Sequence, residues 1–305
     1  MHGILLVDKP EGMTSNDVVR VLKRVVKPAK VGHSGTLDPA ASGLMVMLIG
    51  AATRALDYLY ENPKNYTLTV CLGEETDTDD RDGNVLRSSD VSGIQRNRIE
   101  EVVERYRGVI HQVPPHFSAI KKAGVPLYKL ARKGVFPDLS PRKVEIFSLT
   151  IKKWEEPFLD LDMICSRGTY ARAVARDIGR DLGVGGRLES LRRDACGQFK
   201  LKDALTFDQL MNEGPDKVSA SLIGLNSALS HIPEIETPLS EMVKLMKGNP
   251  VFVSRSCLHR AVSSEHPTKR LFRVVSRSGD FLILTRPEPK ADEIALHPVR
   301  VFNMT

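Results

Sequence analysis

The spacing of apolar residues predicts that a strand and a helix open the chain. Residues 3–8 carry the continuous apolar run Ile-Leu-Leu-Val, which is typical of a buried strand. Ser15 is a suitable N-cap for the helix that follows, and Pro28 stops that helix. Between these two positions, apolar residues recur at helical spacing at Val18, Leu22, Val25 and Val26.

The same kind of pattern divides residues 44–182 into short elements. Apolar or alternating runs predict strands at 44–49, 66–72, 144–152 and 158–165. Helical spacing predicts helices at 51–60, 99–106, 128–133 and 170–182. Because strands and helices mix without strict alternation, we expect an α+β fold rather than a parallel α/β sheet.

The end of the chain predicts a separate unit. The sequence IPEIETP at 232–238 is typical of a linker, and a short helix is expected at 239–246. Apolar runs at 271–275 and 281–285, with Gly279 between them, indicate a hairpin. We therefore expect two domains, residues 1–235 and a small β-rich domain of residues 236–305.

Two segments lack periodicity. Residues 31–43, VGHSGTLDPAASG, predict a long loop, and residues 74–83 predict an acidic turn region. The loop holds His33, Asp38 and three glycines, which let backbone approach a ligand closely. Judged by composition alone, Asp38 before Pro39 is better explained as the start of a turn.

Charge adds a possible partner to this outline. The net charge is +6 and the pI is about 9.1. Residues 120–143 contain seven Lys or Arg against one acid, and residues 167–202 contain nine against four. Such runs are usually solvated faces, but two of them with interspersed Gly and aromatic residues favour a groove for a polyanion.

Cysteine usage and hydropathy narrow the class of protein. Cys71, Cys165, Cys196 and Cys257 are scattered, without the spacing of a zinc site or a disulfide framework, so we expect reduced thiols. No stretch approaches the roughly 18 apolar residues of a membrane span, and the first apolar run is too short for a signal peptide. A soluble, cytoplasmic protein is expected.

Several segments together resemble one known family. GHSGTLDPAASGLM is similar to the catalytic segment of the TruB family of pseudouridine synthases. Five further segments resemble other parts of that family and occur in the family's order between residues 3 and 199: GILLVDKPEGMTS, KNYTLTVCLGEETDTDDRDG, QVPPHFSAIKKAGVPLYKLARKG, SRGTYARAVARDIG and LRRDACGQF. MKGNPVFV and HPVRVFNMT fit the family's C-terminal PUA or PUA-like domain more loosely.

The resemblance implies a fold and a reaction. The fold is a mixed, largely antiparallel central sheet flanked by helices and loops, followed by a small PUA-like RNA-binding domain. The reaction is the isomerisation of uridine 55, in the T-loop of tRNA, to pseudouridine by a monomer that needs neither a guide RNA nor an obligatory protein partner. It requires no metal or organic cofactor, because the isomerisation is redox-neutral.

The resemblance also assigns three catalytic residues. Asp38 is the catalytic carboxylate, which acts by covalent attack on the base or the sugar or by assisting a glycal route. Arg172 keeps Asp38 charged through an ion pair. Tyr66 stacks on the target base and is placed for proton transfer. Without the resemblance, Arg172 would be taken for a helix-surface arginine and Tyr66 for a half-buried strand residue.

Six further residues are assigned to substrate binding. His33 enters the RNA stack where the uridine leaves, because a stacked base must be exposed before it can react. Asp80 pairs with the arginine and orients it, and Lys9 supports the floor of the site. The acidic residues around Asp80 could also form a metal-binding loop, but their spacing does not match a calcium loop. Phosphates are expected to contact Lys121, Lys129 and Arg132.

Two alternatives remain open. One is the catalytic subunit of a guide-RNA-dependent synthase, as in dyskerin-like proteins, although the chain lacks a long Lys-rich tail. The other is an RNA-binding or tRNA-folding protein whose catalysis is secondary or lost. The presence of Asp38, Tyr66 and Arg172 argues against lost catalysis.

Overall fold

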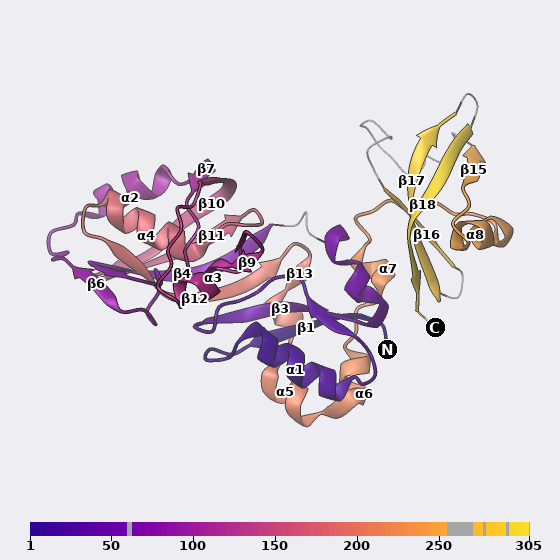
Figure 1. The fold of residues 1–305 in the computed structure, drawn as a ribbon, viewed down its shortest axis with the longest axis horizontal. Coiled ribbons are helices and arrows are strands. Elements are labelled where there is room, and N and C mark those ends of the chain that lie inside the picture. Colours follow the sequence, from indigo (N-terminus) through magenta and orange to yellow (C-terminus); the bar gives the residue numbers. More distant parts are fainter. Residues whose placement is uncertain (60–62, 255–270, 277–278, 291–292, 305) are drawn as a thin grey trace.

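The larger part of the molecule is built on one ten-stranded sheet (Figure 1). The structure is a computed structural model that describes residues 1–59, 63–254, 271–276, 279–290 and 293–304. The main path of the sheet runs β14-β1-β3-β12-β4-β11-β10-β7, with β2 paired to β3 and β13 paired to β12. These strands are β1 (Gly3–Lys9), β2 (Val31–His33), β3 (Ala41–Ile49), β4 (Lys64–Leu72), β7 (Gly108–Gln112), β10 (Arg142–Glu155), β11 (Phe158–Cys165), β12 (Gly186–Cys196), β13 (Phe199–Lys200) and β14 (Leu205–Thr206).

Antiparallel pairing dominates this sheet. Only β1–β14 and β3–β12 are parallel among its described pairs. The predicted α+β fold with a mixed, largely antiparallel sheet is therefore confirmed. Two small two-stranded sheets flank it, formed by β5 (Glu74–Thr76) with β6 (Val85–Ser88) and by β8 (Lys121–Lys122) with β9 (Val125–Pro126).

The apolar runs of β1 and β3 are explained by burial on both faces of the sheet. Leu5 and Val7 point into one hydrophobic cluster, whereas Ile4 and Leu6 point into another. A strand covered on both sides reads as a continuous apolar run rather than as an alternating one. The first cluster also takes apolar side chains from α1 (Ser15–Val25), α2 (Arg96–Glu104), α4 (Ala171–Asp181), α5 (Phe207–Asn212) and α6 (Gly214–Ala220).

The second cluster joins the main sheet to the C-terminal part of the chain. It contains residues of η1 (Gly50–Arg54), η2 (Leu56–Tyr58) and α7 (Leu225–Ala228), the partly buried Leu201 of η3 (Leu201–Asp203), and Leu282, Leu284 and Phe302. The predicted helix 51–60 is thus wrong in type, because two short 3₁₀ helices cover this region; Tyr60 lies outside the described residues.

The predicted loop 31–43 is shorter than expected. Its first three residues form β2, which pairs with β3 in the register Val31–Ile49 to His33–Met47, and β3 begins at Ala41 rather than at Leu44. Glycine and serine carry little strand signal, so backbone pairing with the apolar half of β3 decides the structure here. Only residues 34–40 remain as a loop. The acidic segment 74–83 likewise begins with a short strand, β5.

The N-cap of α1 is one residue earlier than predicted. Thr14, not Ser15, caps the helix: its side chain accepts a hydrogen bond from the Asp17 amide, and the Asp17 side chain completes a capping box. The helix ends at Val25, before Pro28, as expected. The short helix expected at 128–133 is α3 (Leu127–Ala131).

A four-stranded antiparallel sheet forms the C-terminal part, in the order β15-β18-β17-β16 (Figure 1). Its elements are β15 (Val251–Ser254), β16 (Phe272–Val275), β17 (Phe281–Pro289) and β18 (Glu293–Asn303), with α8 (Leu239–Met246) beside them. The predicted hairpin is the β16–β17 pair, and Gly279 has φ +79°, as a tight turn requires. Two residues of the turn, 277–278, lie outside the described part.

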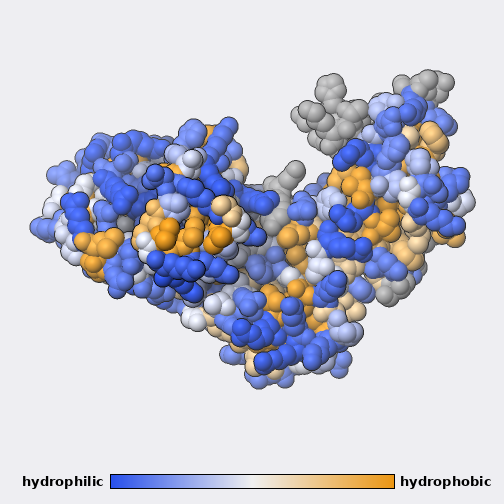
Figure 2. Space-filling model, in the orientation of Figure 1, coloured by the Kyte–Doolittle hydropathy of each residue, from blue (hydrophilic) through white to orange (hydrophobic). Residues whose placement is uncertain are grey.

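The boundary at 235/236 stays a prediction. Glu234 already bridges to Arg273 of β16, so the segment expected as a linker contacts the second sheet. Figure 2 shows a mostly hydrophilic face with separate apolar areas over both parts. No helix in the described part is long and apolar enough to cross a membrane. Cys71, Cys165 and Cys196 are free thiols, and Cys257 lies outside the described residues.

Candidate active site

Two side chains of the N-terminal segment, Lys9 and Ser15, form hydrogen bonds with the loop of residues 34–40. The hydroxyl of Ser15 donates to the Leu37 carbonyl (2.9 Å) and accepts from the Leu37 amide (2.8 Å). Lys9 is 0% exposed, and its ammonium donates to the carbonyls of Pro10 (2.8 Å), Met13 (2.8 Å) and Pro39 (3.4 Å). These contacts fix the residues on either side of Asp38.

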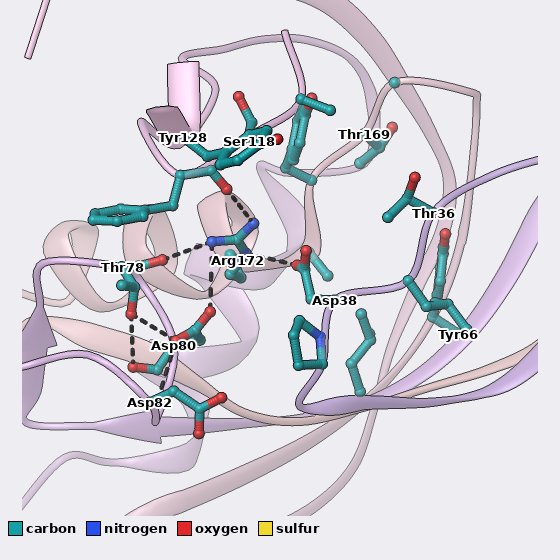
Figure 3. Close-up of a pocket in the computed structure, with 18 of the residues that line it drawn as sticks. Thr36, Asp38, Tyr66, Thr78, Asp80, Asp82, Ser118, Tyr128, Thr169 and Arg172 are labelled. Carbon is teal, nitrogen blue, oxygen red and sulfur yellow. Dashed lines mark hydrogen bonds and ion pairs between the residues drawn. The ribbon is translucent and has the colours of Figure 1, made fainter. Parts of the chain in front are cut away.

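Arg172, at the start of α4, gathers three separate segments around its guanidinium (Figure 3). Its Nε lies 2.9 Å from Asp38 Oδ2, and its Nη1 lies 3.4 Å from Asp80 Oδ2. Nη1 also donates to the Thr78 carbonyl at 3.0 Å, and Nη2 donates to the Phe117 carbonyl at 2.8 Å. The Arg172 side chain is only 6% exposed, whereas that of Asp38 is 40% exposed. Asp38 is therefore both fixed and open to a ligand.

Two further arginines of α4 repeat this arrangement at intervals of four residues. Arg176 Nη1 lies 2.9 Å from Asp79 Oδ2, and Arg180 Nη2 lies 2.9 Å from Glu75 Oε2. Residues four apart lie on one face of a helix, so Arg172, Arg176 and Arg180 form a ladder that binds the segment 75–80. The resemblance had assigned Asp38 and Asp80 to Arg172, whereas the partners of Arg176 and Arg180 could not be identified without the fold.

A cavity of about 630 Å³ opens beside Asp38. Elements far apart in the sequence contribute to its wall: the loop 34–40, β4, the segment 78–82, the loop 117–119, α3 and the start of α4. Its charged and hydroxyl-bearing residues are Thr36, Asp38, Lys64, Tyr66, Thr78, Asp80, Asp82, Ser118, Tyr128, Arg132, Thr169, Tyr170 and Arg172. Of these, Thr36, Lys64, Thr169 and Tyr170 lie in segments that resemble the family, but no role was assigned to them from the sequence.

Burial shifts the ionisation of the groups around this cavity. Burial raises the pKa of Tyr66 to about 12, and Arg193 beside it only partly opposes this, so Tyr66 is neutral at pH 7. Burial also raises the pKa of Asp80, against hydrogen bonds from Thr78 and the charge of Arg172. Thr78 Oγ1 donates to Asp80 Oδ1 at 2.6 Å.

The structure brings together only part of the predicted site. Asp38, Tyr66, Asp80, Arg132 and Arg172 line the same cavity. The roles assigned to them stay predictions.

The other predicted residues lie away from the cavity wall. Lys9 lies beneath the loop, which fits a supporting rather than a contacting position. Lys121 and Lys129 are exposed, and they stand on the small hairpin and the helix beside the cavity. His33 lies on β2, where burial and Arg193 lower its pKa, so that its ring is neutral at pH 7.

The acidic segment offers no metal site. Among the described residues, no group of three or more His, Cys, Asp or Glu side chains is placed to hold a metal ion. Its aspartates are used inside the protein instead: Asp77 accepts from the amide and the side chain of Asn84, and Asp80 accepts from Asp82 N. Together with the arginine ladder, these bonds hold the segment against α4.

Known proteins are similar to this chain in sequence and in fold. Residues 23–171 match the model of the TruB family pseudouridylate synthase N-terminal domain, and residues 172–229 match that of the tRNA pseudouridylate synthase B C-terminal domain. Relatives named tRNA pseudouridine synthase B include those of Clostridium perfringens, 39% identical over 95% of this chain and 96% of the relative, and of a Marinomonas species, 38% identical over 92% and 93%.

Solved structures agree on the fold. One chain of a Cbf5-Nop10-Gar1 complex superposes with a TM-score of 0.72 over 98% of this chain and 84% of that chain. A chain of an archaeal Nop10-Cbf5 complex superposes with a TM-score of 0.70. Sequence identity to the two chains is 23% and 21%.

Proposed function

The chain belongs to the TruB family of pseudouridine synthases and is therefore an isomerase that forms pseudouridine in tRNA; on this premise we propose that it modifies uridine 55 of the T-loop, without a guide RNA, through Asp38. The uridine is flipped out of the RNA stack into the cavity. His33 fills the gap that it leaves, and Tyr66 stacks on its base.

The ion pair between Arg172 and Asp38 carries this proposal. A carboxylate with one oxygen 2.9 Å from a buried guanidinium has a fixed orientation, yet 40% of the Asp38 side chain remains exposed. Asp80, 3.4 Å from the same guanidinium, holds the arginine in place from the other side. Fixing a reactive group before the substrate arrives lowers the entropic part of the barrier.

The reaction exchanges one bond of the uracil ring for another. The bond from C1′ of the ribose to N1 breaks, the base turns, and a bond from C1′ to C5 forms. The proton on C5 is lost and N1 gains one, so the product is an isomer of the substrate. Asp38 can attack the sugar or the base, or can take a proton from the ribose on the glycal route. Tyr66 is placed for a proton transfer; because its hydroxyl is neutral, it can carry the C5 proton only by releasing its own hydroxyl proton at the same time.

Guide-free action is favoured over the guide-dependent alternative by the relatives. The proteins that share about 40% of their residues with this chain along most of its length carry tRNA in their names. The Cbf5-Nop10-Gar1 complex and an H/ACA RNP bound to a substrate RNA resemble it at 23% identity or less, which concerns the fold alone. We also propose that the enzyme acts as a monomer in the cytoplasm, and that it assists tRNA folding.

A pseudouridine assay on unmodified tRNA transcript tests this function. We expect product at uridine 55 from the purified chain alone, and none in a transcript whose residue 55 is cytidine. Product only after a guide RNA or partner proteins are added would favour the guide-dependent alternative. Product at other uridines with none at position 55 would refute the assigned target.

A further inference from the structure

Two cations lie together at the end of the cavity that holds Tyr66. Lys64 belongs to the cavity wall, and Arg193, from β12, is only 1% exposed. Both approach Gly35 of the loop: an ideal Cβ on that glycine would lie 3.2 Å from Lys64 Nζ and 3.5 Å from Arg193 Nη1. Figure 3 shows Tyr66, Thr36 and Thr169 on the side of Asp38 away from Asp80 and Asp82.

Neither cation has an anionic partner in the described part of the chain. Arg193 donates from Nε to the Leu44 carbonyl (2.7 Å) and from Nη2 to the Gly35 carbonyl (3.1 Å), while its buried Nη1 forms no hydrogen bond of standard geometry. No described carboxylate forms an ion pair with Lys64 or Arg193. Arg193 is therefore held by neutral groups, and neither cation meets a carboxylate.

The neighbouring ionisable side chains do not supply the missing charge. The pKa of Tyr66 is about 12, and burial raises the pKa of the Cys165 thiol to about 11, so both groups are neutral at pH 7. Burial and the nearby Arg193 lower the pKa of Lys64. A buried cation without a partner is costly to the folded state, so its presence beside a cavity points to an anion in the ligand.

The phosphodiester is the only anionic group that the RNA substrate offers. We propose that Lys64 binds a phosphate of the RNA strand next to the flipped uridine, and that Arg193 behind it strengthens the positive potential at this end. This inference rests on the proposed function. It also fixes how the nucleotide is oriented in the cavity. The phosphate is attracted to the Lys64 end and repelled by Asp38, Asp80 and Asp82. The ribose and base therefore lie between the two ends.

The test pairs a protein variant with a substrate variant. T-arm RNAs are made with one methylphosphonate, which is uncharged, replacing the phosphate either 5′ or 3′ of the target uridine. The wild type, Lys64→Met and a surface control, Lys153→Met, are assayed on both RNAs and on the unsubstituted RNA. Lys153 is exposed and paired with Glu155, away from the cavity.

One of the two methylphosphonates should lower kcat/KM of the wild type by about tenfold, the value of a charged hydrogen bond. Lys64→Met should lose about the same on the unsubstituted RNA and lose nothing more on that methylphosphonate RNA. Its affinity should also fall less steeply with salt, by about 0.7 in the logarithmic slope, because one phosphate contact is gone. Lys153→Met should behave as the wild type does.

Two results would overturn the phosphate contact. One is a Lys64→Met variant whose loss multiplies with both methylphosphonate losses, since the lysine and the phosphates would then act independently. The other is a Lys64→Met variant that melts well below the wild type, since the lysine would then serve the fold. Product from the wild type on the unsubstituted RNA secures the proposed function within the same experiment.

Discussion

A buried arginine lies at each end of the cavity, and the two arginines differ in their charged partners. Arg172 meets Asp38 and Asp80, and its remaining nitrogens donate to two carbonyls. Arg193 is buried more deeply but meets only neutral groups, two carbonyls and the Tyr66 hydroxyl, with Lys64 as a second cation beside it. The arginine of the first end has anionic partners in the free protein, whereas the cations of the second end gain one only when an anion arrives.

This difference separates two kinds of contribution to function. Charges that are already paired hold the reactive group still, so removing one of them should harm both the fold and the rate. Charges that gain a partner only from the ligand should contribute to the rate and to RNA binding, and the folded protein should tolerate their removal. The predictions that follow test this division, beginning with the largest expected effect.

Asp38→Asn removes the reactive group and leaves its size. We expect the rate of pseudouridine formation to fall by on the order of 10⁴-fold or more, because no other group of the cavity can replace the carboxylate. The affinity for tRNA, measured by filter binding, should stay within about threefold, and any help with tRNA folding should persist. A variant that forms product at a near wild-type rate would remove Asp38 from the mechanism.

Arg172→Lys keeps the charge but loses the planar fork that reaches two carboxylates and two carbonyls. We expect kcat to fall by about 10²-fold and thermal stability to drop, because lysine cannot satisfy these groups together. Arg180→Lys is the matched control on the same helix face, where the Arg180 side chain is 55% exposed; its rate should stay close to that of the wild type. Equal effects of the two substitutions would mean that the ladder serves the fold alone.

Lys9 extends the comparison to a cation that is bound by carbonyls only. Burial lowers its pKa from 10.5 to about 8, so between these pH values the unfolded chain holds a proton that the folded protein has released. The free energy of unfolding should therefore rise with pH in this window, by about 3 kcal/mol relative to Lys9→Met. Denaturant titrations of both proteins at pH 7, 8.5 and 10 measure the difference. A constant difference would show that the folded protein keeps the ammonium.

Ser15→Ala and Thr14→Ala separate support of the loop from support of the helix. Ser15→Ala removes both hydrogen bonds to Leu37, and we expect kcat to fall by roughly threefold to tenfold because Asp38 is then less firmly placed. Thr14→Ala removes only the helix cap and should lower the free energy of unfolding by about 1 kcal/mol. Its kcat should not change, and a fall in kcat would connect the cap to the site.

Strands that are buried on both faces were predictable from the sequence, whereas charged central strands were not. β1 and β3 carry apolar runs because two clusters cover them. β12 lies between β3 and β4, yet its sequence GRLESLRRDAC carries five charged residues and no apolar run. Its arginines contact distant segments: Arg192 pairs with Asp8, and Arg193 donates one hydrogen bond to the Leu44 carbonyl. Local pattern contains no information about those partners.

The candidate site likewise has residues that were assigned from the sequence and residues that were not. Asp38, Tyr66, Asp80 and Arg172 were assigned through the resemblance to a family, because composition alone favoured a turn at Asp38. Their convergence depends on contacts that span more than 90 residues, as between Asp80 and Arg172. Lys64 and Arg193 lie in segments that resemble the family, but no role was assigned to them, because a charged residue is normally expected at the surface.

The cluster that links the first strand to the last has a consequence for biosynthesis. Ile4 and Leu6 share their hydrophobic cluster with Leu225 and Ala228 of α7, which contacts β1, so this face of β1 is not fully covered until residue 228 has left the ribosome. Chaperones that bind nascent apolar strands have this interval in which to act. A catalytic fragment shortened before β17 would lose Leu282, Leu284 and Phe302 from this cluster, and would need new polar residues on the surface so exposed to remain in solution.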